Sequence, residues 1–335
     1  MKIFLTGATG YIGHNLAMEL VSQGHYLHVL VRNPSASFEL DHPHIRIFKG
    51  DITDINSVIP AIKNCEEVYH TAALTKMQVY DRSKFYAINT TGTGNILEAA
   101  YNEGVKKLVL TSSASVFGPS SQYPIQEDDP RITSFDNDYE LSKMLAENLA
   151  LDYARRGLHT CIVFPTRVFG PGPATYSNAI NRFIKIFLEN GFAIIPSGLA
   201  AIGNYAFVND IVKGHILSMK HGNSGEKYIL GGENISFSYF FETIKKLSGN
   251  SGKYIHLPKN LLKSIARCKE YIDSLLHRDT DLTTDIIDRF YINRALSSQK
   301  ACTQLGYAIT PFEVGIDQTI QSIKQSILCK TVSMS

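Results

Sequence analysis

The chain of 335 residues is long enough for one large hydrophobic core or for two closely joined lobes. Its 33 basic and 31 acidic side chains leave a net charge of +2, which gives no reason to expect nucleic acid or an anionic membrane as a partner. The five cysteines are scattered and odd in number, so they argue against a disulfide framework or a structural zinc and fit a reducing cytoplasm.

The first predicted strand covers residues 2–6, at the very start of the chain. This position leaves no room for a signal peptide. No later stretch approaches the about 18 consecutive apolar residues that a membrane helix needs. We therefore expect a cytoplasmic protein that acts on a small molecule and has no membrane span.

A glycine-rich turn, GATGYIG, follows this strand, and an apolar helical pattern follows the turn. In this context the N–H groups at the helix N-terminus bind the pyrophosphate of a dinucleotide. Gly7 allows the tight turn, Gly10 lets the backbone approach the phosphates, and Gly13 lets helix and strand pack closely. The predicted cofactor contacts of this turn are Gly7, Thr9, Gly10, Tyr11, Ile12 and Gly13.

Strands and helices alternate through the first half of the sequence. The predicted strands cover residues 26–31, 45–48, 68–70, 107–111 and 159–164, and the predicted helices cover 54–62, 87–101 and 139–156, with Asp54 as an N-cap. Such alternation predicts an α/β fold with a doubly wound parallel sheet and right-handed crossovers.

Beyond residue 170 the regular alternation stops. Helices are predicted over residues 178–188, 238–247 and 259–276, and a strand over 228–230. We expect two domains: a dinucleotide-binding domain over 1–170 and a smaller α+β substrate lobe over 171–330, interleaved with the core near 202–215. The lobe is expected to close over the edge of the sheet at which the parallel strands end.

The chemistry is predicted from a tyrosine and a lysine four residues apart. Tyr139 and Lys143 lie on the same face of a predicted helix. The lysine ammonium and a positive nicotinamide ring would both lower the pKa of the tyrosine from its ordinary value of about 10. Because such a pair is common by chance, an exposed pair without function is the alternative. The strand end TSSASVFG, which contains Ser112 and Ser113, lies upstream of this helix.

These motifs together resemble the extended short-chain dehydrogenase/reductase family, also described as the NAD-dependent epimerase/dehydratase superfamily, over about residues 1–240. The resemblance implies a Rossmann-type fold, a nicotinamide cofactor and a catalytic set of Ser113, Tyr139 and Lys143. In this set Ser113 would bind the substrate oxygen and hold it against Tyr139. Ser112 is the less favoured alternative to Ser113. No metal-ligating cluster is visible, and the chemistry requires none.

The resemblance extends to further cofactor positions. Asp51 and Ile52 match the pair that holds adenine, and residues 71–73 match the loop under the middle of the cofactor. We expect His70, just before this loop, to be a core histidine. The resemblance adds the following residues to the predicted cofactor site: Asp51, Ile52, Thr71, Ala72, Ala73, Asn89, Pro165 and Val168.

The second strand predicts which dinucleotide is bound. In NAD-specific relatives this strand ends in an acid that bonds the adenosine ribose, and Val31 takes that place here. Arg32 follows it and offers a guanidinium for a 2′-phosphate, although a solvated arginine is the alternative. The pattern favours NADP(H), with NAD(H) as the second choice.

Two departures predict the reaction. Relatives that act on nucleotide sugars carry arginines where this chain has Phe164 and Tyr205, and the segment 164–171 resembles the dihydroflavonol 4-reductase-like group. Arg167 is cationic, with a structural ion pair as its alternative role. Aromatic residues expected near the pocket suit, as a set, an apolar carbonyl compound, and they are Phe117, Phe169, Tyr176, Phe183 and Tyr205. Taken one at a time, most of them are expected to be core residues.

We therefore predict an NADP(H)-dependent oxidoreductase that reduces a ketone or an aldehyde. The alternatives are a nucleotide-sugar epimerase or dehydratase and a protein that senses NADP(H) without turnover. The family commonly pairs the helices that correspond to residues 87–101 and 139–156 with their twins, so a homodimer is expected.

Overall fold

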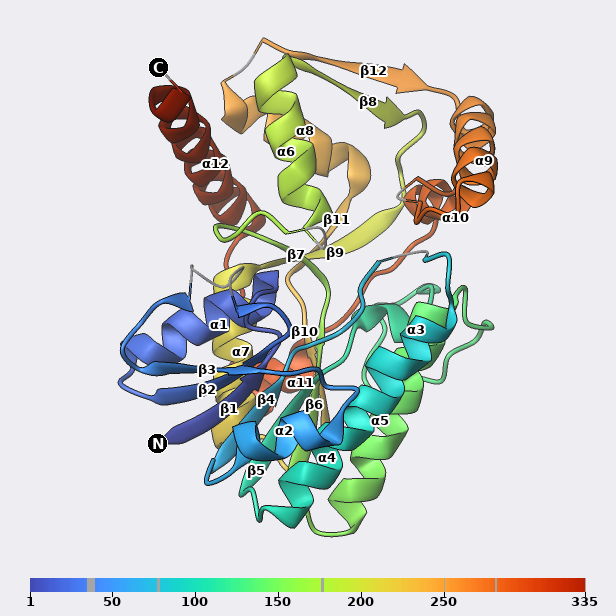
Figure 1. The fold of residues 1–335 in the computed structure, drawn as a ribbon. Helices are drawn as coiled ribbons and strands as arrows, with labels where there is room; N and C mark the ends of the chain where they lie inside the picture. Colours follow the sequence, from blue (N-terminus) through green and yellow to red (C-terminus); the bar gives the residue numbers. More distant parts are fainter. Residues whose placement is uncertain (35–39, 77–78, 176–177, 250, 281, 335) are drawn as a thin grey trace.

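The central sheet of the protein has seven parallel strands in the order β10-β6-β5-β4-β1-β2-β3 (Figure 1). The computed structural model describes residues 1–34, 40–76, 79–175, 178–249, 251–280 and 282–334. The strands are β1 (Lys2–Thr6), β2 (Tyr26–Val31), β3 (Ile45–Lys49), β4 (Glu67–His70), β5 (Lys107–Thr111), β6 (Thr160–Pro165) and β10 (Lys227–Leu230). The strand order reverses between β1 and β4, which is where such sheets bind ligands. The predicted Rossmann-type sheet is confirmed.

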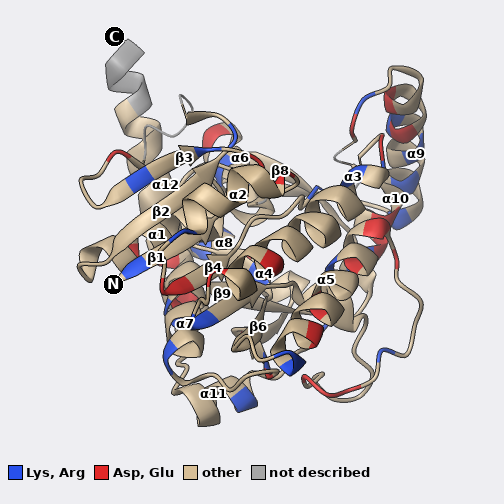
Figure 2. Cartoon of the chain, turned by 60° about the horizontal axis from the view of Figure 1, so that its bottom comes forward, with Lys and Arg blue, Asp and Glu red and all other residues tan. Residues whose placement is uncertain are grey.

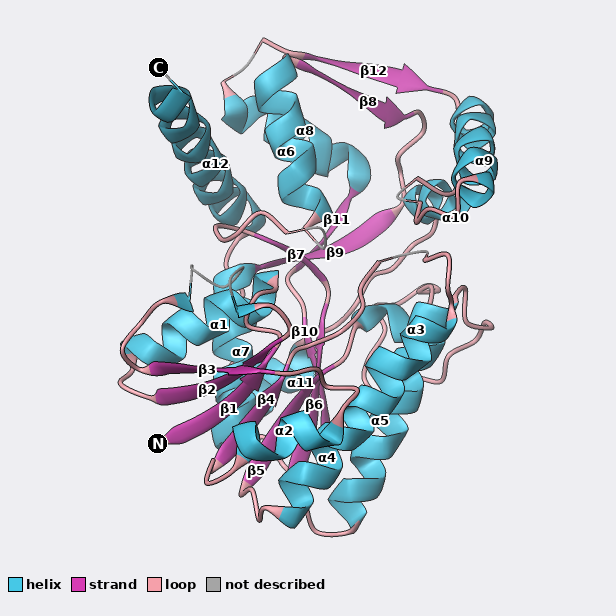
Figure 3. Cartoon of the chain, viewed as in Figure 1, coloured by secondary structure: helices cyan, strands magenta, loops and turns pink. Residues whose placement is uncertain are grey.

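Helices cover both faces of this sheet (Figure 3). One face carries α1 (Tyr11–Ser22), α7 (Val208–His221) and α11 (Gln299–Leu305), and the other carries α2 (Ile55–Ile62), α4 (Gly92–Asn102) and α5 (Asp138–Arg155). Successive residues of β1 alternate between the two cores: Ile3 and Leu5 pack in the first, and Phe4 packs in the second. Alternation of this kind in a strand buried on both faces explains its continuous apolar sequence.

Local signals in the sequence locate most of the element ends. The Asp54 carboxylate accepts a hydrogen bond of 3.0 Å from the backbone N–H of Asn56, which confirms the predicted N-cap of α2. The helix predicted over 87–101 is present, but its first part is the π-helix η3 (Tyr86–Thr91), which follows the short helix α3 (Ser83–Phe85). Such insertions are often found at functional sites.

The second half of the chain contributes more to the main sheet than the sequence analysis predicts. The strand at 228–230, predicted for the smaller lobe, is β10, and it pairs in parallel with β6 at the edge of the main sheet. Helix α7, which was not predicted, packs beside α1 under the same sheet. The interleaving expected near 202–215 therefore extends to β10 and α11, and we propose that these segments belong to the dinucleotide-binding domain.

A smaller body lies over the sheet edge at which the parallel strands end (Figure 1). Its strands are β7 (Arg167–Phe169), β8 (Phe192–Pro196), β9 (Ile202–Phe207), β11 (Glu233–Ser236) and β12 (Lys253–Leu257), arranged as a β11-β9-β7 sheet and a β12-β8 pair. Its helices are α6 (Ala179–Asn190), α8 (Phe237–Ser248), α9 (Lys259–Leu275), α10 (Thr284–Asp288), the 3-10 helix η5 (Arg289–Tyr291) and α12 (Phe312–Met334). Phenylalanines dominate its core, among them Phe187, Phe240 and Phe312.

Acidic and basic side chains occur on both bodies (Figure 2), in line with the nearly balanced charge of the sequence. Among the described residues, no helix is both long and apolar enough to cross a membrane.

Candidate active site

A cavity of about 750 Å³ lies between the sheet edge and the smaller body. Its wall combines the glycine turn, the ends of several central strands, the start of α5 and aromatic residues of the smaller body. The predicted site residues that line it are Gly7, Thr9, Gly10, Tyr11, Ile12, Gly13, Arg32, Asp51, Ile52, Thr71, Ala72, Ala73, Ser113, Tyr139, Lys143, Pro165 and Val168. Residues far apart in the sequence are thus brought into one cavity.

The glycine turn forms a cradle that side chains would block. Gly7 has a φ of +79°, and its carbonyl accepts a 2.8 Å hydrogen bond from the N–H of Gly10. A Cβ on Gly7 would lie 2.6 Å from the backbone nitrogen of Ala72, and one on Gly13 would collide with the Gly7 carbonyl. Because Gly10 caps α1 without a side chain, the first N–H groups of the helix face the cavity uncovered. This cradle fits the pyrophosphate of a dinucleotide.

The loop after β4 is held against β1. The Thr71 hydroxyl donates to the Thr6 carbonyl at 2.7 Å. His70 is fully buried, with Nδ1 2.6 Å from the Thr6 hydroxyl and Nε2 2.9 Å from the Thr93 hydroxyl. Burial lowers the pKa of His70 to about 3, so the ring is neutral. The prediction of a core histidine is confirmed.

Asn89 lies behind the cavity wall. Its Oδ1 accepts a 2.7 Å hydrogen bond from the Leu74 N–H, and its Nδ2 donates to the Ser142 hydroxyl at 3.0 Å. Asn89 therefore connects the loop after β4 to α5. Its expected contribution to cofactor binding is to position these two elements.

The far end of the cavity is formed by the ends of β2 and β3. The Asp51 carboxylate accepts hydrogen bonds from the N–H and the hydroxyl of Thr53, both at 2.9 Å. Val31 is buried, and the exposed Arg32 lines the cavity next to it. The side chain that follows Val31 at this end of the cavity is therefore the cation Arg32, and position 31 supplies no carboxylate.

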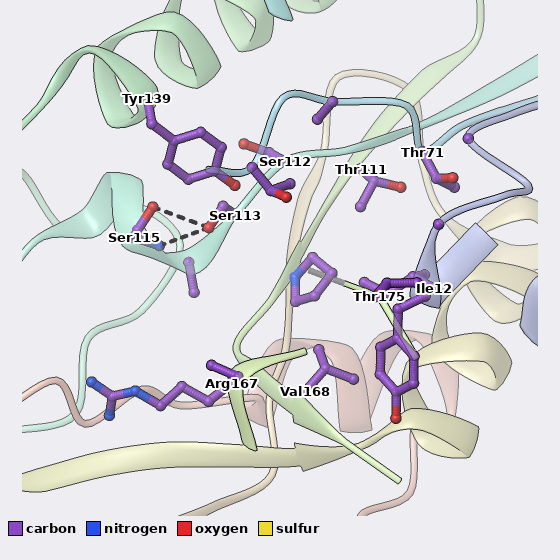
Figure 4. A pocket seen from close by; sticks show the side chains of 18 of the residues that line it. Ile12, Thr71, Thr111, Ser112, Ser113, Ser115, Tyr139, Arg167, Val168 and Thr175 are labelled. Carbon is purple, nitrogen blue, oxygen red and sulfur yellow. Dashed lines mark hydrogen bonds between the residues drawn. The ribbon is translucent and has the colours of Figure 1, made fainter. Parts of the chain in front are cut away.

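Ser113 and Ser112 have different partners. The Ser113 hydroxyl caps the 3-10 helix η4 (Ala114–Phe117): its oxygen lies 3.0 Å from the Ser115 hydroxyl and accepts from the Ser115 N–H at 3.3 Å (Figure 4). The Tyr139 ring points toward Ser113 in the same view. Ser112 instead donates to the buried Glu147 carboxylate at 2.5 Å. The Ser112 hydroxyl is thus hydrogen-bonded to α5.

Burial raises the pKa of Tyr139 above its ordinary value, and the Ser113 hydroxyl and the charge of Arg289 oppose this shift. The combined effect of Lys143 and a bound nicotinamide ring on this pKa stays a prediction, and in the described chain Lys143 is not among the groups that shift it. The reason is the position of the lysine ammonium, which donates to the Thr111 carbonyl at 2.7 Å. The phenol of Tyr139 consequently keeps its proton at neutral pH.

Lys143 is 1% exposed, and burial lowers its pKa to about 8. Glu147, one helical turn further along α5, opposes this shift with its negative charge. The sequence analysis does not include Glu147, although its spacing of four residues from Lys143 could have indicated it.

The aromatic residues predicted near the pocket divide into two groups. Phe183 and Tyr205 line the cavity, whereas Phe117 packs against Phe164, and Phe169 lies in the core of the smaller body. Phe117 on the 3-10 helix and Phe169 on β7 are thus core residues, as the alternative expects, and they do not line the cavity. Tyr176 lies outside the described residues.

Arg167 lines the cavity without an ion pair to any described carboxylate, so its interpretation as a structural ion pair is wrong. Its guanidinium lies over the ring of Phe237, 4.8 Å from the ring centroid. Two further arginines of the wall, Arg289 and Arg294, were not predicted, and no short motif marks them. Among the described residues, no group of three or more histidines, cysteines or carboxylates is placed to hold a metal ion.

The model of the NAD dependent epimerase/dehydratase family matches residues 3–231. The chain belongs to this family. It is accordingly an NAD(P)-dependent enzyme of the oxidoreductase type, and the resemblance to extended short-chain dehydrogenases/reductases is confirmed.

Relatives in this family carry names of different reactions. Sterol demethylase protein B of Methylococcus capsulatus is 28% identical over 282 residues, 82% of each chain. A Synechocystis relative whose name refers to dihydroflavonol 4-reductase is 29% identical over 312 residues, 90% of this chain and 89% of that protein. A UDP-N-acetyl-alpha-D-glucosaminuronate decarboxylase of Bacillus cytotoxicus is 30% identical over 271 residues, 77% of this chain and 83% of that protein.

The fold is also found in solved structures. The crystal structure of a protein named gox2253 matches with a TM-score of 0.80 at 29% identity, covering 97% of this chain and 98% of that one. The family and the fold are therefore common to enzymes of several names, and the substrate has to be inferred from the cavity.

Proposed function

We propose that the protein is an NADP(H)-dependent reductase that converts a ketone or an aldehyde into an alcohol. The observation that carries this proposal is that Ser113, Tyr139 and Lys143 line the same cavity as the glycine turn. A carbonyl compound in this cavity would meet a hydroxyl donor, a protonated phenol and a lysine ammonium together.

In this proposal Tyr139 is the acid and Ser113 orients the substrate. When bound, NADPH supplies a hydride to the carbonyl carbon. The Tyr139 phenol donates its proton to the carbonyl oxygen, which the Ser113 hydroxyl holds by a hydrogen bond. Lys143 binds the ribose next to the nicotinamide, and stabilisation of the phenolate by its charge stays a prediction, because its ammonium bonds to the Thr111 carbonyl in this structure. At neutral pH the Tyr139 phenol carries the proton that this step needs, and burial, which raises its pKa, keeps the phenol in this form.

The walls of the cavity support an apolar substrate body. Aromatic side chains of the smaller body form much of this part of the wall, and they are Phe183, Phe237, Phe240, Phe241 and Phe290. Leu296, which packs in the core of the main sheet, adds an aliphatic side chain. Apolar surface of this kind binds by removing a hydrophobic body from water.

A nucleotide-sugar epimerase or dehydratase is the second candidate. It is favoured by the decarboxylase relative and by the arginines in the wall, which bind phosphates as readily as other anions. Against it, Phe164 and Tyr205 stand where the sequence analysis expects the arginines of nucleotide-sugar enzymes.

Replacement of the proposed acid is expected to stop turnover. Tyr139→Phe removes only the phenol oxygen, so the NADPH-dependent rate should fall by about 10²–10⁴-fold while NADPH affinity changes little. Tyr123→Phe is the matched control, because Tyr123 is 77% exposed and does not line the cavity. The rate is followed by NADPH absorbance over a panel of carbonyl compounds. A Tyr139→Phe enzyme with more than a tenth of the wild-type rate would contradict the assignment of Tyr139 as the acid.

The rate should also depend on the charge of Lys143. Because the pKa of Lys143 is about 8, its ammonium is present below this pH and is lost above it. We expect kcat/KM for reduction to fall about tenfold per pH unit above about pH 8. In Lys143→Arg the guanidinium stays charged, so the fall should move to higher pH. A wild-type profile that stays flat to about pH 10 would contradict this prediction.

NADPH is expected to bind more tightly than NADH. Arg32 offers a cation at the end of β2, and Val31 supplies no carboxylate that would repel a 2′-phosphate. Both affinities are measured by fluorescence titration of the wild type, of Arg32→Ala and of the control Arg46→Ala, whose residue does not line the cavity. Arg32→Ala should lose the preference and Arg46→Ala should keep it. Equal wild-type affinities would remove the argument.

We further propose a homodimer built on α4 and α5. These helices pack against each other, and Met144, Leu145, Leu149 and Tyr153 of α5 remain half-buried in the single chain. A two-fold contact would cover them. Analytical ultracentrifugation is expected to give a dimer at micromolar concentration, and a monomer there would count against the proposal.

A further inference from the structure

Several buried polar atoms in the cavity wall have no hydrogen bond. Arg167 Nη1 and the Tyr205 hydroxyl are shielded from solvent and face each other without a well-aligned hydrogen bond. Burial lowers the pKa of Arg167 and raises that of Tyr205, and the contact between the two side chains opposes both shifts. Arg294 Nε and Nη1 and Arg289 Nε are also shielded from solvent and have no hydrogen-bond partner among the described residues. All four residues line the cavity. Since buried polar groups in native proteins are nearly always hydrogen-bonded, these atoms indicate a ligand that supplies acceptors.

The charges around these atoms do not balance. Asp136 and Glu140 are the carboxylates paired with Arg131, Arg289 and Arg294, at distances from 2.7 to 4.0 Å. Three guanidiniums thus share two carboxylates, and Arg167 adds a fourth cation with no acid of its own among the described residues. A buried cation without a partner is unfavourable, so a negative charge bound at this part of the wall would be stabilised.

The guanidiniums are also close enough to repel one another. Burial lowers the pKa of Arg167, and the positive charge of Arg289 adds to this shift. Burial also lowers the pKa of Arg294, and the positive charges of Arg289 and Arg167 add to that shift. An anion placed among them would relieve this repulsion as well as satisfy the free donors.

Arg167 is held in place by its surroundings. Its strand β7 pairs in parallel with β9, where Arg167 lies opposite Tyr205. The guanidinium lies over Phe237, and a Cβ on Gly203 would collide with Nη1. In Figure 4 the Arg167 side chain extends away from Ile12 and Thr175, on the side of the cavity where Ser115 and Tyr139 lie. The Arg167 guanidinium is therefore at the substrate end and away from the glycine turn.

We propose that the substrate carries a carboxylate, and that Arg167 binds this group together with the Tyr205 hydroxyl and Arg294. The inference rests on the proposed function, because it assigns the substrate class of the same site. A planar carboxylate offers two oxygens to the fixed fork of a guanidinium. The rest of this wall is made mainly of phenylalanine rings, and its further donors are Thr166, Asn204 and Arg289. The substrate is thus an apolar body with one anionic group.

The test uses the full-length protein saturated with NADP⁺. Binding of 2-naphthoate and of its neutral analogue 2-naphthamide is measured by calorimetry and by thermal melting. The two probes have the same shape and differ in charge. Wild-type protein should bind 2-naphthoate at least about tenfold more tightly, because charge-assisted hydrogen bonds are stronger than neutral ones.

Variants then assign the preference to Arg167. Arg167→Met should weaken 2-naphthoate by about 10–100-fold and leave 2-naphthamide nearly unchanged. Arg156→Met is the matched control, because Arg156 is exposed and stacks on Tyr153 outside the cavity, and it should bind like the wild type. Arg167→Lys keeps the charge and should keep part of the preference, which provides a second readout if Arg167→Met does not fold. Retained melting stabilisation by NADPH shows that a variant is folded.

Two results would overturn the inference. The first is that the wild type binds both probes equally or binds neither, or that Arg167→Met binds 2-naphthoate as the wild type does. If NADPH-dependent reduction of a neutral ketone is then found, the proposed function stands without the carboxylate. The second is a melting shift of several degrees with millimolar UDP, TDP or GDP that Arg167→Met removes. That result would assign the arginines to a diphosphate and would overturn the reductase proposal as well.

Discussion

A buried carboxylate next to the proposed acid joins the two bodies of the protein. Glu140 is 0% exposed and accepts from Arg131 at 2.9 Å and from Arg289 at 2.8 Å. Arg131 belongs to the loop before α5, and Arg289 belongs to the smaller body, far away in the sequence. Removing one partner of a buried ion pair typically destabilises a protein by about 3–5 kcal/mol, because the other charge stays buried without compensation. The position of Tyr139 relative to the smaller body depends on the ion pair between Glu140 and Arg289.

The ion pairs between the two bodies also explain why the cavity is both apolar and cationic. The smaller body packs around a core of phenylalanines, and its inner surface continues this apolar character into the cavity. The arginines that reach Asp136 and Glu140 cross this surface, so the connection between the bodies places guanidinium groups in the wall. Structural ion pairs and ligand-binding cations are therefore parts of one network, and Arg167 is the member that no described acid neutralises.

Burial also determines the chemistry of the proposed catalytic residues. The pKa of Tyr139 is raised and that of Lys143 is lowered to about 8, both mainly because the side chains are removed from water. Each shift favours the neutral form of its group. A neutral phenol suits proton donation during reduction, and a lysine that loses its charge near pH 8 couples the site to pH. The names of the relatives refer to several reactions, whereas these shifts depend on this chain alone.

The sequence by itself determined the glycine turn, the Tyr139–Lys143 pair and the positions of the first six strands along the chain. These features depend on local rules: glycine where a side chain would collide, four residues for one helical turn, and apolar runs for buried strands. Only the tertiary structure decided that β10 completes the main sheet, that Arg289 and Arg294 join the wall, and that the ammonium of Lys143 bonds to Thr111. Those outcomes depend on contacts between segments far apart in the sequence, such as Asp136 and Arg294, which are 158 positions apart, and on the burial that results. No local pattern contains that information, because burial is a property of the assembled chain.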